Sequence, residues 1–435
     1  MRLAALAAAI VAAAVVPDGA PGVGIVVVAL LVAVAARLGT GSSLDLWLFG
    51  TAALALAGIA ALSDAAWVVA IDLIVALLLG TLAVGGATLL APIAPARALR
   101  SVPEITPRPN AAVVPVARGI GLVGIVTVPF AALLISADAA FAAIADGIPF
   151  PATDLWPARG VVFVFVLAGA LGLGLVRREP LRQLSLERPR ALRPIEWMLP
   201  LGALVALLVA FVGVQVTVLF GGRDHVLRTT GLTYAEYARS GYWQLLATAV
   251  LTLAVIAAAL RLADTPTRSH RVILRALLAA LCGLTLVLLA SALHRLDLYE
   301  SAFGLTRLRL TAEAFAWGLA GFFALMVLAG AVPAVGRNFA RTAIAATAAG
   351  LLAFSLSNPD GTIARQNIER WRTTGSLDVG YLETLSADAA PSIAELPPGL
   401  RDVALAPLAE RLAPGDGWGS LNLSRQRARD VLAAK

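Results

Sequence analysis

The sequence is poor in the residue types that build disulfide frameworks, metal centres and charged soluble surfaces. Its one cysteine, Cys282, lies in an apolar run, so neither a disulfide framework nor a cysteine metal site can form within the chain. Three histidines, His225, His270 and His294, are too few and too scattered to indicate a metal centre. Only 14% of the residues are charged and 59% are hydrophobic, whereas soluble domains have about 25% charged residues. An ordinary soluble enzyme and a disordered chain are therefore excluded.

The chain also lacks the short motifs of common catalytic sites. It contains no H-E-x-x-H zinc motif, no Walker loop and no nucleophile elbow. Residues Gly119–Gly124 match G-x-G-x-x-G, but they lie inside an apolar run with no strand before them, which favours close helix packing. We therefore assign no catalytic residue, no metal ligand and no cofactor. The sequence favours a non-enzymatic protein, although Asp297 with Glu300 leaves open an acid/base pair acting on an envelope substrate.

Lysine is nearly absent, and the net charge of +7 comes from arginine. The arginines lie mostly between apolar runs, a distribution that encodes orientation in a membrane. No basic stripe with interleaved aromatic residues is present, so we expect no nucleic-acid partner.

Long apolar runs dominate the sequence, and each spanning helix needs about 20 mainly apolar residues. We therefore predict an all-α polytopic membrane bundle of ten or eleven transmembrane helices within the lipid bilayer. The number depends on residues 1–20, which form either a retained helix or a cleaved signal peptide. The expected spans are Leu3–Val16, Val23–Arg37, Leu44–Leu62, Ala65–Leu90, Val113–Ile135, Val161–Val176, Trp197–Phe220, Tyr242–Leu262, Val272–His294, Leu310–Val332 and Phe339–Leu356.

The arginine distribution predicts the orientation of these spans. With Met1 in the cytoplasm, inner segments carry eighteen arginines and outer loops carry seven. Cytoplasmic loops are the ones enriched in arginine and lysine. We therefore expect a protein of the bacterial cytoplasmic (inner) membrane with a cytoplasmic N-terminus and an extracytoplasmic C-terminus.

The chain changes character after residue 356. Residues 1–356 form the predicted transmembrane domain, whereas residues 357–435 carry ten acids and nine bases and are compatible with water. We predict a small helical tail whose first helix starts after Asp360 as its N-cap, with further helices near Val379–Ala389, Leu400–Leu412 and Leu423–Leu432. The tail is expected to pack over the outer loops and is a candidate docking site for an envelope protein.

Three groups of polar residues are candidates for function. Asp72 lies within an apolar span, where an acid costs about 2.5–3.5 kcal/mol on insertion scales; it is either a paired structural acid or a carboxylate on a transport path. The other two groups lie in outer loops, where tyrosines also serve as membrane anchors and charged residues pair with each other. These two groups are Tyr234, Tyr237 and Arg239, and Arg295, Asp297, Glu300, Arg307 and Arg309.

We combine these features into one functional hypothesis and its alternatives. The first hypothesis is a non-enzymatic envelope protein whose outer-face polar site serves small-molecule transport or sensing. The main alternative is an envelope scaffold whose C-terminal tail docks a partner protein. An enzyme embedded in the membrane is less favoured.

Several short segments from residue 220 to the end are similar to a known family. They include Phe220–Gly222, Leu232–Gly241, Leu298–Arg309, Asn358–Asn367, Leu377–Leu382, Leu385–Pro391 and Trp418–Arg425. Together they resemble the bacterial multi-pass membrane family labelled domain of unknown function 4173, with its 4153 relatives. Phe303 departs from the tyrosine expected in that family, which removes any hydroxyl role at this position. The resemblance implies a multi-pass membrane protein and assigns no activity.

Overall fold

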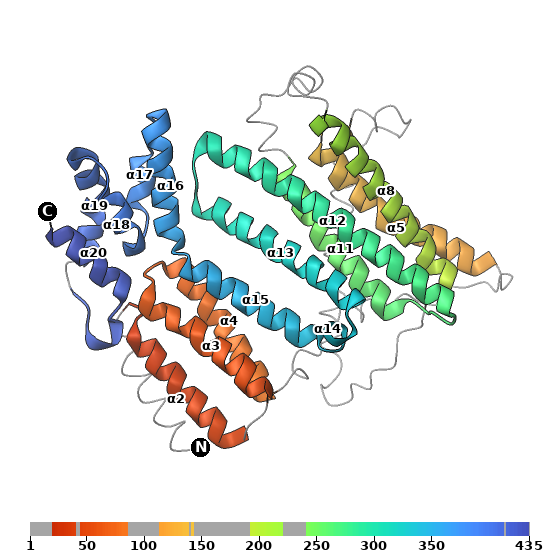
Figure 1. Cartoon of the computed structure of the whole chain (residues 1–435), viewed down its shortest axis with the longest axis horizontal. Helices are drawn as coiled ribbons and strands as arrows, with labels where there is room; N and C mark the ends of the chain where they lie inside the picture. Colours follow the sequence, from red (N-terminus) through yellow and green to blue (C-terminus); the bar gives the residue numbers. More distant parts are fainter. Residues whose placement is uncertain are drawn as a thin grey trace, which may run out of the picture. The chain divides into compact units, whose positions relative to one another are not determined.

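The computed structural model describes residues 20–40, 44–85, 113–138, 141–142, 192–220, 241–412 and 415–434. This part of the chain is helical, without a β-strand and with one isolated β-bridge between Leu192 and Ala263 (Figure 1). The all-α prediction is therefore confirmed. The helices up to residue 356 are α2 (Val23–Thr40), α3 (Leu44–Leu62), α4 (Ala66–Gly85), α5 (Val113–Ala137), α8 (Pro194–Phe220), α11 (Tyr242–Leu262), α12 (Arg268–Phe303), α13 (Arg307–Ala331), α14 (Pro333–Arg337) and α15 (Phe339–Leu356).

The long helices arise where apolar residues run without a break. Within the described residues, six helices are long and apolar enough to cross a membrane, in α5, α8, α11, α12, α13 and α15. The chain is therefore a multi-pass membrane protein. The ends of α3, α11 and α15 coincide with the predicted spans. Two predicted spans, Leu3–Val16 and Val161–Val176, lie outside the described residues, so a total of ten or eleven helices stays a prediction.

Helix α12 is much longer than predicted. It continues for nine residues beyond His294, so the predicted outer loop after His294 is wrong up to Phe303. The reason is that no glycine or proline interrupts the chain before Gly304, which has a positive φ of 80°. Its 36 residues make a helix about 54 Å long at about 1.5 Å per residue, against about 30 Å of hydrocarbon. Several turns of α12 therefore extend beyond the membrane.

The chain forms two compact units. Unit 1 comprises residues 1–92, 303–314 and 338–435, and unit 2 comprises residues 93–302 and 315–337. In unit 1, α2, α3, α4 and α15 pack around buried apolar side chains that include Phe49, Leu56 and Leu79. In unit 2, α5 packs against both α8 and α11.

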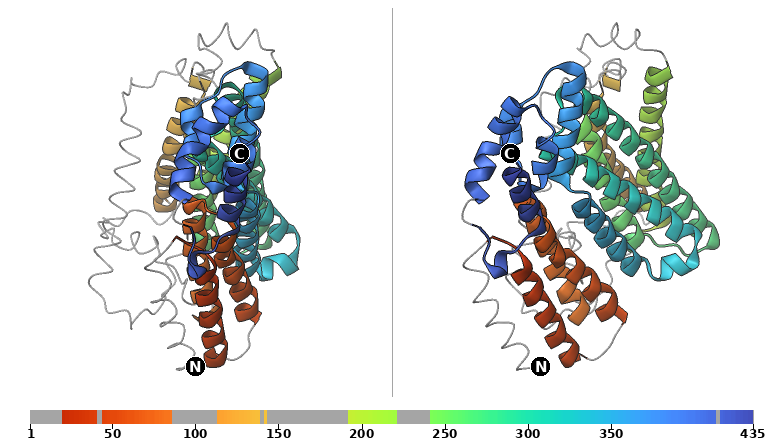
Figure 2. Two further views of the ribbon diagram at one scale, coloured as in Figure 1. Left: turned by 90° about the vertical axis from the view of Figure 1, so that its left-hand side faces the viewer. Right: turned by 60° about the vertical axis from the view of Figure 1, so that its left-hand side comes forward.

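The C-terminal helices of unit 1 gather at one end of α2, α3 and α4 (Figure 2). They share a core of buried side chains centred on Ile363, Leu382 and Leu405, and Leu305 from the α12–α13 connection completes it. A boundary between two domains at residue 356 stays a prediction. These helices are α16 (Pro359–Thr374), α17 (Val379–Glu383), η4 (Ala387–Ala389), α18 (Ala390–Ile393), α19 (Pro398–Leu412), η5 (Trp418–Ser420) and α20 (Leu423–Ala433).

Helix α16 begins two residues earlier than predicted. Its N-cap is Asn358 and not Asp360, and the Asn358 side chain accepts a hydrogen bond from the Gly361 backbone N–H. Asn358 has a positive φ of 54°, which asparagine tolerates better than most residues. Pro359 follows at the first helical position, where proline is favoured. Asp360 is thereby left free of the capping role and lies fully buried.

Candidate functional site

Asp360 forms the centre of a buried polar cluster in unit 1. Arg307, the first residue of α13, binds it through two parallel hydrogen bonds, from Nε to Oδ1 at 2.9 Å and from Nη2 to Oδ2 at 2.5 Å. The Trp67 indole donates to Oδ1 at 3.1 Å, and the Ser386 backbone N–H donates to Oδ2 at 2.9 Å. Four donors from α13, α4 and the loop before η4 therefore converge on one carboxylate.

The donors around Asp360 fix its charge. Burial alone raises the pKa of the Asp360 carboxyl, but hydrogen bonds from Arg307 and Ser386 outweigh burial and hold the pKa below its ordinary value. The Tyr381 hydroxyl accepts a hydrogen bond at 2.8 Å from the Arg307 backbone N–H, and burial raises the pKa of that hydroxyl. A charged Asp360 and a neutral Tyr381 thus both bind the first residue of α13.

The connection between α12 and α13 is held by Asn367 of α16. Its amide accepts from the Leu305 N–H at 2.9 Å and donates to the Leu305 carbonyl at 2.8 Å. Gly304 is required beside it, because a Cβ there would lie 2.4 Å from the Asn367 Oδ1 at a positive φ. The C-terminal helices therefore bind both the backbone and the side chains at the start of α13.

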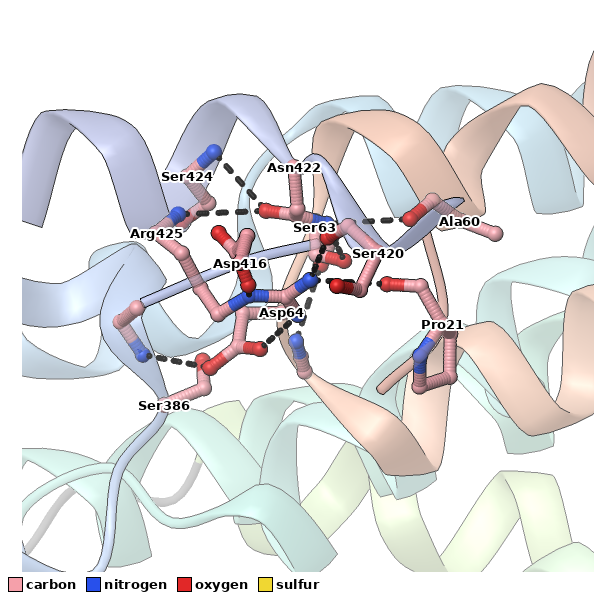
Figure 3. A network of polar contacts seen from close by, with 12 residues as sticks. Pro21, Ala60, Ser63, Asp64, Ser386, Asp416, Ser420, Asn422, Ser424 and Arg425 are labelled. Atoms are coloured by element: carbon pink, nitrogen blue, oxygen red, sulfur yellow. Dashed lines mark hydrogen bonds and ion pairs between the residues drawn. The ribbon is translucent and has the colours of Figure 1, made fainter. Parts of the chain in front are cut away.

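Arg425 of α20 is the centre of a second cluster in unit 1, drawn in Figure 3. Its Nη1 binds Asp64 Oδ1 at 2.7 Å and its Nε binds Asp416 Oδ1 at 2.9 Å, while Nη2 donates to the carbonyls of Pro21 and Ser420. The Arg425 side chain is only 5% exposed. One arginine thus links α20 to the turn between α3 and α4 and to the residues before α2.

The turn between α3 and α4 is also bound to the segment around Asp388. The Asp64 N–H donates to Asp388 Oδ2 at 2.7 Å, and the Ala387 N–H donates in return to Asp64 Oδ2 at 3.3 Å. Asn422 extends this contact by donating to the carbonyls of Ala60 and Ser63 (Figure 3). Burial raises the pKa of Asp388 and outweighs the hydrogen bond from the Ser386 hydroxyl.

These contacts form one set, which we call the docking network. It joins the C-terminal helices to three places: the residues before α2, the α3–α4 turn and the start of α13. Ser386 connects the two clusters, because its backbone N–H donates to Asp360 and its hydroxyl donates to Asp388. The network is formed by Asp64, Arg307, Asp360, Tyr381, Asp388, Asn422 and Arg425.

Unit 2 contains a separate buried ion pair. Arg295 of α12 binds Asp138 Oδ2 at 2.7 Å, and both side chains are only 2% exposed. The Gln215 amide of α8 donates to the same oxygen at 2.9 Å, and Arg295 Nη1 donates to the Ala137 carbonyl at 2.8 Å. A Cβ on Gly241 would lie 2.1 Å from that carbonyl, so glycine is required. Arg295 therefore ties α12 to the end of α5 and does not lie in a loop.

Asp72 of α4 is buried within unit 1, where it contacts Ser355 of α15. Its Oδ1 accepts a hydrogen bond from the Ser355 hydroxyl at 3.0 Å, while Oδ2 has no hydrogen-bond partner. In the described part of the chain no cationic side chain forms an ion pair with Asp72. The structure thus supplies a neutral hydroxyl to this carboxyl.

The predicted site residues are not gathered into one place. Arg307 joins the docking network, and Arg309 Nη1 donates to the Gly304 carbonyl. Asp297 and Glu300 lie on the extended part of α12. Tyr234, Tyr237 and Arg239 lie outside the described residues. A functional role for any of these side chains stays a prediction.

Sequence reasoning missed most of the docking network. Asp64, Asp388, Asn422 and Arg425 look like ordinary surface residues, because no pattern links positions that are more than 300 residues apart. One signal was available: Asp64 is the lone acid in a turn of a few residues between two apolar runs. Charged residues in such short turns are candidates for binding a folded tail.

The pKa shifts of Asp388 and Asp360 predict how docking depends on pH. A raised pKa favours the protonated carboxyl in the folded state, so the Asp388 contribution is present at low pH and is lost as the pH rises through that raised pKa. The Asp360 contribution has the opposite sign: it is present above the ordinary value of 3.8 and is lost as the pH falls through the lowered pKa. We expect the docked helices to be most stable near pH 3.8 and to lose stability as the pH rises from there through the raised pKa of Asp388.

The measurement is the temperature at which α16 becomes sensitive to protease, recorded from acidic to neutral pH. Asp388→Asn keeps an oxygen that can accept from Asp64 and Ser386 but cannot ionise. This variant should therefore lose the decline in stability toward neutral pH and keep the decline at acidic pH. The same decline in wild type and Asp388→Asn would contradict the assignment.

Comparison with known proteins places the chain in a family. No curated protein and no solved structure shows significant similarity to it. The family model for Domain of unknown function (DUF4153) matches residues 23–396. The match includes the N-terminal helices and ends before α19, whereas the predicted resemblance began only at residue 220. The label 4173 is not the one that matches. The chain therefore belongs to the DUF4153 family.

Proposed function

We propose that this protein is a non-enzymatic membrane protein that presents α16 to α20 at one membrane face as a docking platform for a partner protein. The docking network is the observation that carries the proposal. It holds the C-terminal helices through buried charges, and a buried charge is costly unless it is paired and hydrogen-bonded. Three separate attachments fix the orientation of these helices relative to α2, α3 and α4. A tail that acted only as a tether would not need a fixed orientation.

The chemistry of the network favours docking over small-molecule binding at this place. The Arg307 guanidinium is occupied by Asp360 and by the Thr384 carbonyl, and the Arg425 guanidinium binds two carboxylates and two carbonyls. Donors used in this way are not available to an anionic ligand. The exposed surface of α16 and α19 instead carries both signs of charge together with apolar Val403, a mixture suited to a protein partner. The arginine distribution supports an orientation in which this face lies outside the cytoplasm.

The proposal is tested by photo-crosslinking in cells. A photoreactive amino acid is placed at Arg365 on α16 and at Val403 on α19, with exposed Leu77 in the apolar helix α4 as the control position. We expect one discrete crosslinked protein from the two C-terminal positions and none from Leu77. The product should decrease strongly when Arg425→Ala releases α20, while the abundance of the protein is unchanged. The absence of a crosslinked product, or an equal amount of product in wild type and Arg425→Ala, would contradict the docking platform.

Asp72 favours a second candidate function, the movement of protons or another cation across the membrane. Its carboxyl is fully buried about 10 Å from the start of α4, and among the described residues its one hydrogen-bond partner is the Ser355 hydroxyl. Ionisable residues within transmembrane segments commonly mark ion pathways. A carboxyl without an ion-pair partner is able to take up and release a proton, whereas a structural acid is held by a cation.

The test uses the proton as the probe. The full chain is reconstituted in liposomes that carry an internal pH indicator, and a potassium diffusion potential drives proton entry. We expect Asp72→Asn to abolish proton entry, because the amide cannot ionise, and we expect exposed Asp402→Asn in α19 to leave it unchanged. Equal rates of proton entry in wild type and Asp72→Asn would assign Asp72 to helix packing alone.

A further inference from the structure

The segment that links α19 to α20 exposes large apolar side chains at the end of the apolar helix α2. Trp418 is 61% exposed, Leu421 45% and Leu423 39%. The glycines beside Trp418 carry no side chain that would cover it. Apolar side chains exposed to water are unfavourable. Exposed apolar patches of this kind therefore mark contact surfaces.

The backbone of this segment is held at the point where α2 begins. The Val23 N–H donates to the Leu421 carbonyl at 3.0 Å, and a Cβ on Gly22 would lie 2.5 Å from the Ser420 carbonyl carbon. Asn422 donates to the carbonyls of Ala60 and Ser63 at the end of α3. Trp418 and Leu421 therefore lie level with the ends of two apolar helices.

The length of α3 places this level at the membrane boundary. Its 19 residues span about 28 Å, which nearly equals the hydrocarbon thickness of about 30 Å. At the other end of α3, Trp47 lies in the first turn and is 57% exposed. Tryptophan is enriched at both membrane–water interfaces. Trp47 and Trp418 are thus tryptophans at opposite boundaries of one helix bundle.

We propose that Trp418, Leu421 and Leu423 insert into the interfacial layer of the bilayer that the apolar helices α2 and α3 are predicted to cross, and so anchor α20 to lipid. Trp418 supplies the indole N–H that favours the headgroup level, and the two leucines supply apolar surface. Exposed Arg427 lies one turn after Leu423 on α20, where it faces the same headgroups. This inference is independent of any partner protein, and the anchor lies beyond the region that the family model matches.

The first experiment measures membrane depth in the full chain, reconstituted in nanodiscs of phosphatidylcholine and phosphatidylglycerol. Cys282→Ser removes the one native cysteine, and a nitroxide is attached to Trp418→Cys. Val403→Cys on α19, which is 54% exposed, and Leu77→Cys on α4, which is 70% exposed, serve as the water and lipid references. We expect the ratio of oxygen to nickel-chelate accessibility at 418 to exceed that at 403 several-fold and to approach that at 77.

Two results would overturn the proposal. Accessibility at 418 equal to that at 403 would place Trp418 in water. Low accessibility to both reagents would mean that protein covers it, a second copy or a partner. A second measurement avoids the label: the fluorescence that Trp418→Phe removes should be strongly quenched by lipids brominated near the headgroup. Fluorescence that is insensitive to these lipids would also contradict the anchor.

Discussion

Asp360→Ala is expected to release the C-terminal helices from α13 and to lower the free energy of unfolding of unit 1 by about 3 kcal/mol. The substitution leaves the Arg307 guanidinium, the Trp67 indole and the Ser386 N–H without their shared acceptor. Removing one partner of a buried ion pair costs about 3–5 kcal/mol. We take the lower end of that range because the Arg307 side chain is 34% exposed and water partly screens its charge.

The loss is measured by the protease sensitivity of α16 in nanodiscs and by equilibrium unfolding in mixed micelles. The matched control is Arg372→Ala, which breaks an ion pair with Glu395 in the same unit. Both side chains of that pair are more than half exposed, so the control should change the free energy by less than about 1 kcal/mol. Equal losses in the two variants would show that Asp360 does not hold the C-terminal helices.

Arg295→Ala is expected to lower the free energy of unfolding of unit 2 by about 3–5 kcal/mol, because it removes the guanidinium that pairs with the buried Asp138 carboxylate. Asp138 would keep the Gln215 amide at 2.9 Å and the Phe141 backbone N–H at 3.2 Å as donors, but neutral donors do not replace a guanidinium. The Ala137 carbonyl would also lose its donor from Arg295. The effect should appear in equilibrium unfolding with sodium dodecyl sulfate.

Two further variants separate the ion pair from general damage. Arg295→Met combined with Asp138→Leu removes both charges and keeps apolar volume, so it should recover much of the loss. Arg118→Ala breaks a pair that also joins α5 to another helix, but its atoms are 4.0 Å apart and Arg118 is 48% exposed. This control should cost less than about 1 kcal/mol. A double variant as unstable as Arg295→Ala would contradict the ion-pair explanation.

The sequence by itself determined the class of the protein and the ends of many of its helices. Apolar runs of membrane-spanning length predicted α3, α11 and α15 to the residue, because hydropathy along the chain decides which segments leave water. The helical character of residues 357–435 was predicted from balanced charge and from the turns that interrupt it, but the predicted helix Val379–Ala389 is divided into α17 and η4. The family was reached through local motifs, although the matching model carries the 4153 label.

Only the tertiary structure decided which charges are paired. Arg307 binds Asp360 across 53 residues, Arg295 binds Asp138 across 157, and Arg425 binds Asp64 across 361. Hydropathy gives the position of each helix along the chain. It gives neither the rotation of a helix about its own axis nor the helices that pack beside it, and a polar pair forms only when the rotation and the neighbours are both fixed. The same limit explains Arg295, which by sequence belongs to a charged loop and in the structure is buried between helices.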